Sequence, residues 1–257
     1  MEVRELKRHY AQLVFQKAIY ELVAEARRGY LGIIWWVMEP VLYLGVFYIL
    51  FVVLFRRGGD DAVNFLLAGL VVWKWFASSI LQCSNSIGIN NGLIWQINIP
   101  KILFPIISIV NNTIKFGIIF AIFVVYLLVT GVEPSAVWFL LPIVLIAQFL
   151  LISGLSLLVS AIVPFVPDLR FLIDNGMMLL FFLSGIFFDV SSVSSDLKIY
   201  LYFNPMLGLI EAYRDILLNN QLPDFQVISL TILFSTLLIG IALSIFRKFD
   251  RVYAKII

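Results

Sequence analysis

The stretch VWFLLPIVLIAQFLLISGLSLLVSAIV, residues 137–163, contains no Asp, Glu, Lys or Arg. As an α-helix rising about 1.5 Å per residue, it is longer than the roughly 30 Å hydrocarbon core of a bilayer. Lipid offers no hydrogen-bond partners, so the backbone amides of a spanning segment must bond within the protein. A continuous apolar run meets this requirement by forming an α-helix. A membrane barrel strand would instead alternate over about ten residues. The stretch therefore predicts a membrane-spanning helix.

Five further stretches are mostly apolar over a similar length, which gives about six spans in all. We expect them at Leu31–Phe55, Val63–Ile87, Ile102–Thr130, Val137–Val163, Phe171–Phe188 and Val227–Phe246. Hydrophobic residues make up 62% of the 257 residues and charged residues 13%, whereas soluble domains have about 25% charged residues. This composition excludes a soluble or disordered chain, and a net charge of +2 is too small for a nucleic-acid partner. The sequence predicts one all-α integral membrane protein.

The basic residues cluster at the two ends of the chain. They are Arg4, Lys7, Arg8, Lys17, Arg27 and Arg28 before the first span, and Arg247, Lys248, Arg251 and Lys255 after the last. By the positive-inside rule, both termini are expected to be cytoplasmic. Residues 1–30 are too frequently charged for a signal peptide, and their apolar residues recur at helical spacing. This favours an amphipathic helix on the inner membrane surface over a simple cytoplasmic cap. Residues 31–257 then form the transmembrane domain.

Charged and polar residues lie inside the predicted spans. Lys115 shares a helix face with Ser108, Asn111 and Asn112, and Lys74 belongs to a similar face with Ser78 and Gln82. A lysine in mid-bilayer costs about 3 kcal/mol, so each needs a partner or a water-filled cavity. Glu39 is a candidate counter-ion for either. Two interpretations stay open: hydrogen bonding that joins the helices, or the lining of a polar path.

Aromatic residues gather on two of the spans. Tyr43, Phe47 and Phe51 follow one face of the first span, and Phe181 and Phe182 lie in the outer half of the fifth. Such residues are commonly core or belt residues. Their faces could alternatively line a path over which sugar rings slide, because conduction needs weak, repeated contacts.

The segment of residues 189–223 is long for an outer loop and still contains periodic apolar residues. We expect two short helices, broken near Asn204 and Pro205, because proline disfavours helical geometry in the residue before it. Helices that dip into the outer leaflet and return suit a gate over a path.

Motifs for nucleotide binding and catalysis are missing from the chain. It contains no G-x-x-x-x-G-K-[ST], H-E-x-x-H or G-x-S-x-G, and its one histidine, His9, has no second ligand nearby. We therefore expect no catalytic residue, no metal site and no cofactor in this chain. If ATP drives the protein, a separate partner must bind ATP and Mg²⁺.

Four stretches in order resemble the membrane subunits of type-2 ABC exporters of surface polysaccharides, above all the O-antigen exporter permeases. They are YLGIIWWVMEPVLYLGVFYILF (30–51), LAGLVVWKWFASSI (67–80), NNGLIWQINIPKILFPI (90–106) and FNPMLGLIEAYRDILL (203–218). The resemblance covers nearly the whole chain. Glu39 departs from it, because the family more often has a neutral polar residue before this proline.

The resemblance implies a homodimer that docks on two ATP-binding cassette subunits. It places a coupling helix within residues 90–100, where the contacts to the ATPase are Asn91, Leu93, Ile94, Trp95 and Gln96. It also places Asn204, Pro205, Leu209, Tyr213 and Arg214 in a periplasmic gate, and the first and fifth spans along the path. From the residues alone, Trp95 could equally be an interfacial anchor.

The expected function is export of a lipid-linked polysaccharide across the inner membrane, with no chemistry on the substrate. Three alternatives are an exporter of a smaller amphiphile such as a drug or antibiotic, an ATP-independent carrier and an intramembrane enzyme. The carrier would show paired broken helices, and the enzyme a catalytic constellation; the sequence shows neither.

Overall fold

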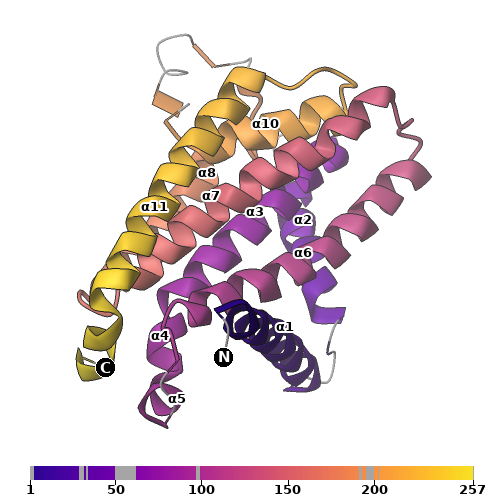
Figure 1. The fold of residues 1–257 in the computed structure, drawn as a ribbon. Helices are drawn as coiled ribbons and strands as arrows, with labels where there is room; N and C mark the ends of the chain where they lie inside the picture. The colour runs from indigo at the N-terminus through magenta and orange to yellow at the C-terminus, as the bar shows by residue number, and fades with distance from the viewer. Residues whose placement is uncertain are drawn as a thin grey trace.

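A computed structural model describes residues 3–28, 32, 34–49, 62–96, 99–190, 193–194, 200–201 and 203–256. These residues form helices and turns without a strand (Figure 1). The all-α prediction is therefore confirmed for this part of the chain. The longer helices are α1 (Val3–Arg28), α2 (Ile34–Tyr48), α3 (Ala62–Ser84), α6 (Leu103–Val129), α7 (Leu141–Ile162), α8 (Leu169–Leu183), α10 (Pro205–Leu217) and α11 (Phe225–Ile256). The short ones are α4 (Ser86–Ile89), α5 (Asn91–Gln96) and the 3₁₀ turn η2 (Ala136–Leu140).

Four helical segments among the described residues are long and apolar enough to cross a membrane. They are Ala62–Ser84, Leu103–Val129, Ala136–Ile162 and Phe225–Tyr253. They coincide with the predicted second, third, fourth and sixth spans. The last helix continues beyond the predicted end at Phe246, because α11 runs unbroken to Ile256.

The predicted first and fifth spans correspond to shorter helices. Within the predicted first span, α2 has 15 residues, and residues 50–55 lie outside the described part of the chain. In the predicted fifth span, α8 also has 15 residues and ends at Leu183 instead of Phe188. The cause is the turn at Gly185, whose φ of +70° suits glycine and not a helix.

The centre of the bundle is α3, which packs against α2, α6, α7, α8 and α10, while α7 makes its most extensive contact with α11. The α7–α11 contact depends on a small residue: a Cβ added at Gly154 would stand 2.9 Å from the backbone oxygen of Ser235. Gln148, Ser153, Ser156 and Ser160 are buried along α7. The fourth span therefore turns its polar residues inward, as bundles in lipid require.

Helix α1 lies across one end of the bundle. Figure 1 shows it nearly end-on, beside the start of α6, whereas α3, α7 and α11 run lengthwise. Its buried stripe is Val14, Ala18 and Leu22. Phe15 and Ile19, which also recur at helical spacing, are exposed. Apolar residues thus occupy both the face on α6 and the face turned away from it.

Candidate functional site

An aromatic pocket opens between α2, α3 and α8. We use this name for a cavity of about 430 Å³ whose lining includes Tyr43, Trp73, Lys74, Phe181 and Phe182. Phe181 is the centre of the aromatic packing: its ring centroid lies 6.4 Å from that of Tyr43, 5.8 Å from Trp73 and 5.3 Å from Phe182. Asp174, Met177 and Met178 on α8 complete one wall.

Three of the five aromatic residues predicted to line a path meet in this pocket: Tyr43, Phe181 and Phe182. Phe47 belongs to α2, but its side chain is not described, and Phe51 lies outside the described residues. The sequence interpretation missed Trp73. Its signal was the WKW triplet of residues 73–75, in which one helix presents a tryptophan to either side of a lysine.

A polar pocket of about 240 Å³ lies along the neighbouring face of α3, and Lys74 lines both pockets. We use this name for the cavity bordered by Glu25, Glu39, Lys74, Lys115 and their neighbours. Glu39 on α2 forms an ion pair with Lys74 on α3. Glu25 on α1 accepts a hydrogen bond from the Lys115 Nζ atom on α6, at 2.5 Å. The structure therefore assigns Glu39, which the sequence could not pair, to Lys74.

The second carboxylate of the polar pocket, Glu25, was not singled out from the sequence. It also accepts a hydrogen bond from the Trp36 indole at 3.2 Å, and the Lys115 ammonium lies 5.5 Å from the centroid of that ring. The predicted polar faces meet nearby, where the Asn112 amide donates to the side chain of Gln82 at 2.9 Å. These contacts join α1, α2, α3 and α6, so polar groups hold the helices together here.

At the opposite end, α10 begins with a well-defined cap. The Asn204 side chain accepts a hydrogen bond from the Met206 backbone at 3.1 Å and donates one to Ser184 at 2.8 Å. Pro205 follows at the first helical position, where a missing amide hydrogen costs nothing. Helix α10 begins where the sequence predicts a break between two short helices, and most of residues 191–202, where the first would lie, fall outside the described part of the chain. Leu209 and Tyr213 are completely buried, so both pack into the core.

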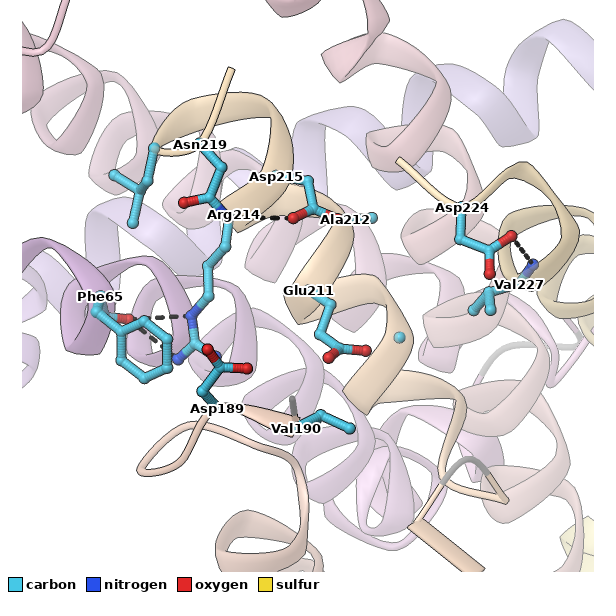
Figure 2. A pocket seen from close by; sticks show the side chains of 12 residues that line it. Phe65, Asp189, Val190, Glu211, Ala212, Arg214, Asp215, Asn219, Asp224 and Val227 are labelled. Carbon is cyan, nitrogen blue, oxygen red and sulfur yellow. Dashed lines mark hydrogen bonds between the residues drawn. The ribbon is translucent and has the colours of Figure 1, made fainter. Parts of the chain in front are cut away.

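Arg214 fastens α10 to two other elements. Its guanidinium donates to the carbonyl oxygens of Phe65 (3.0 Å), Gly185 (2.7 Å) and Ile186 (2.9 Å), and it lies 3.4 Å from the centroid of the Phe65 ring. Figure 2 shows the side chain extending from α10 to Phe65, with Asp189 beside it. The Arg214 side chain thereby connects α10 to the start of α3 and to the turn after α8.

The surroundings of Arg214 are both buried and acidic. Burial lowers the pKa of its guanidinium to about 9, while the carboxylates of Glu211, Asp189 and Asp215 oppose this shift. The group therefore stays protonated at neutral pH. These residues border a cavity of about 260 Å³ (Figure 2). Among the described residues, no three His, Cys, Asp or Glu side chains are placed to hold a metal ion.

The predicted coupling segment, residues 90–100, contains helix α5 and directly follows helix α4. Trp95 is 67% exposed and Gln96 is exposed, whereas Ile94 is buried in a cluster with Ile87 and Phe104. Leu93 and Asn91 are partly buried, and residues 97–98 lie outside the described part. The Lys17 ammonium on α1 donates to the Asn90 side chain at 2.8 Å. Only part of the predicted set therefore faces outward, and Ile94 supports the segment from inside.

A sequence profile of the family described as "ABC-2 type transporter" matches residues 14–218. The chain belongs to this family. The match includes α2 to α10, and with them the aromatic pocket, the polar pocket and the α4–α5 segment.

Curated relatives of this ABC-2 family chain align over nearly its whole length. An O-antigen export system permease protein RfbA from Myxococcus xanthus is 27% identical over 98% of both chains. One of the same name from Klebsiella pneumoniae is 27% identical over 92% of both. A polysialic acid transport protein KpsM from Escherichia coli is 24% identical over 93% of both. The resemblance to type-2 ABC polysaccharide exporter permeases, first seen in four sequence stretches, is thus confirmed.

Proposed function

We propose that this chain is the permease subunit of an ATP-driven ABC transporter that exports a lipid-linked polysaccharide of the O-antigen type. The observation that carries the proposal is the near full-length likeness to relatives named as O-antigen export permeases. A further relative is named for polysialic acid transport, another long glycan. The aromatic pocket supports the same substrate class, because the faces of Tyr43, Trp73 and Phe181 suit sugar rings.

In this proposal two copies of the chain assemble as a homodimer on two separate ATP-binding subunits, which bind ATP and Mg²⁺ and carry out the hydrolysis. The chain itself performs no catalysis. The exposed Trp95 on α5 supports an ATPase contact at this end, because exposed tryptophans are frequent anchors of interfaces. The α4–α5 segment acts as the coupling helix, together with the N-terminal part of the chain.

The proposal also orients the chain in the inner membrane. Both termini and α4–α5 face the cytoplasm, where the basic ends of the sequence belong. Helix α1 lies at the inner surface, and its exposed Phe15 and Ile19 face the lipid boundary. α2 and α8 serve as the first and fifth of six spans and line the path, and α10 serves as a gate helix at the periplasmic end.

The test is reconstitution of the chain in vesicles with and without a candidate ATP-binding partner protein. We expect ATP-dependent movement of a prenyl-diphosphate-linked glycan only when both proteins are present. A dansylated amphiphilic drug of similar size is the comparison substrate. Uphill movement of glycan by this chain alone would contradict the requirement for a partner, and movement of the drug but not the glycan would contradict the substrate class.

A further inference from the structure

Lys74 stands at the junction of the two pockets. It lines both the aromatic pocket and the polar pocket, which lie along neighbouring faces of α3. Among the described residues that line the aromatic pocket, it is the one cation. Its counter-ion, Glu39, borders the polar pocket only. An anion entering the aromatic pocket therefore meets Lys74 but not Glu39.

The Glu39–Lys74 pair is open to the pockets. The side chains of Lys74 and Glu39 are 36% and 34% exposed, whereas that of Lys115 is only 11% exposed. A lysine at this depth is costly without a negative partner. Lys74 can therefore leave Glu39 only when another anion replaces it, and its exposure allows such an exchange.

The remaining lining residues indicate what kind of anion fits. Trp73 and Phe181 offer ring faces for a sugar, and the Asp174 carboxylate can accept hydrogen bonds from sugar hydroxyls. A cavity of about 430 Å³ falls in the range that holds a small organic ligand, about 300–1,000 Å³. One aromatic platform, one hydroxyl acceptor and one cation together suit a sugar joined to a phosphate.

We propose that Lys74 recognises the phosphate of a lipid-linked sugar, and that Glu39 occupies Lys74 until this phosphate displaces it. The inference rests on the proposed function and adds a specificity-determining pair to it. The released Glu39 carboxylate stays in the polar pocket, where Ser78, Gln82 and Asn112 supply hydrogen-bonding groups. A neutral amphiphile cannot displace Glu39 and is selected against.

The test uses the full chain in nanodiscs of phosphatidylcholine, a lipid without net charge. Three probes are titrated by calorimetry: a short prenyl diphospho-N-acetylglucosamine, the same prenyl glycoside without the diphosphate, and the prenyl diphosphate without the sugar. Wild type is expected to bind the first most tightly. Lys74→Met should weaken its binding by about 10- to 100-fold, the range of one charge-assisted hydrogen bond. Glu39→Gln should tighten it several-fold, because the competitor is gone.

A charge exchange separates recognition from folding. Glu39→Lys combined with Lys74→Glu keeps an ion pair between α2 and α3 but places the anion in the aromatic pocket. We expect this variant to melt near the wild-type temperature and yet to lose binding of the diphospho-sugar. Glu25→Gln, which removes a carboxylate from the other ion pair of the polar pocket, is the matched control and should leave the affinity unchanged.

Three results would contradict the role of Lys74 and Glu39, and they do so in different ways. Equal affinity of wild type and Lys74→Met for the diphospho-sugar, or weaker binding by Glu39→Gln, would overturn the role of the pair and leave the proposed function standing. No binding of either sugar probe by wild type would overturn the substrate class, and the inference with it. If nanodiscs containing phosphatidylglycerol abolish the difference between wild type and Lys74→Met, the anion is a lipid headgroup and the assignment to substrate fails.

Discussion

At the scale of single residues, Arg214 is a buried cation that donates hydrogen bonds to three backbone carbonyls. Its guanidinium satisfies the carbonyl oxygens of Phe65, Gly185 and Ile186. Replacing it by methionine keeps an unbranched, flexible side chain but removes the guanidinium and leaves these acceptors unpaired in a buried site. We expect Arg214→Met to lower the free energy of unfolding by about 2–4 kcal/mol, measured as a drop in melting temperature in detergent.

Two further variants sharpen this expectation. Arg214→Lys should recover little stability, because one ammonium cannot match the planar fork that reaches three carbonyls. Arg247→Met removes the same charge from an exposed position on α11 and should change the melting temperature little. If Arg214→Lys melted at the wild-type temperature, the positive charge alone would account for the stability that Arg214 contributes. The planar shape of the guanidinium would then not be required.

Lys115 forms an ion pair with one carboxylate, that of Glu25, so the energy of the pair can be measured directly. Lys115→Leu leaves Glu25 without its ion pair, and we expect a loss of about 1–2 kcal/mol, since the Glu25 side chain is 45% exposed. Glu25→Leu in the same chain should restore part of the loss. A double-mutant cycle of melting curves measures the coupling, and strictly additive effects would show that the two charges do not interact.

The sequence identified the lysines as residues needing partners, but it could not name the partners. Glu25 lies in a segment with many charged residues, so nothing in the sequence distinguishes its carboxylate from the others. It reaches Lys115 because α1 packs against α6. The partners of Arg214 are backbone carbonyls, which every residue has. Pairing of this kind depends on how helices cross, and periodicity within one helix contains no such information.

At the scale of elements, the close approach of α7 and α11 is the contact most sensitive to volume. A Cβ at Gly154 would meet the Ser235 oxygen at 2.9 Å and the Leu238 Cβ at 3.1 Å. Gly154→Val should therefore force the helices apart and cost about 1–3 kcal/mol, measured by thermal melting. Gly240→Ala, on α11 with no neighbour within 4 Å of an added Cβ, is the control and should be neutral or slightly stabilising. Equal melting temperatures for the two variants would contradict this packing.

Whole helices were easier to predict than pairs of residues. The long, mostly apolar stretches at 63–87, 102–130 and 137–163 indicated three long helices, because the backbone hydrogen bonds of a segment in lipid must be made within that segment. The end of α8 was missed by five residues, since Phe187 and Phe188 continue the apolar run beyond the turn at Gly185. Hydropathy indicates which residues can lie in lipid, but it does not locate the end of a helix. Here the helix ends at a turn that contains a glycine with positive φ.

At the scale of the whole molecule, α1 joins the two regions that the proposed function must couple. Near its middle, Lys17 binds Asn90 between α4 and α5. Near its end, Glu25 contacts Trp36 on α2 and Lys115 on α6. We expect α1 to transmit a displacement of the α4–α5 segment to α2, which borders both pockets.

The last prediction concerns the origin of that displacement. Trp95 is 67% exposed at the α4–α5 end, and Leu222 is 68% exposed in the loop before α11. If α5 docks on the ATP-binding subunit, Trp95→Glu should weaken the association by about 2 kcal/mol, roughly thirtyfold, and reduce ATP-dependent export accordingly. Leu222→Glu introduces the same charge at a matched exposure in the loop before α11 and should leave the association unchanged. The measurements are affinity between the purified proteins and export from reconstituted vesicles. Because Trp95 is exposed, neither variant should alter the melting temperature, and an unchanged affinity of Trp95→Glu would place the ATPase contact elsewhere on this chain.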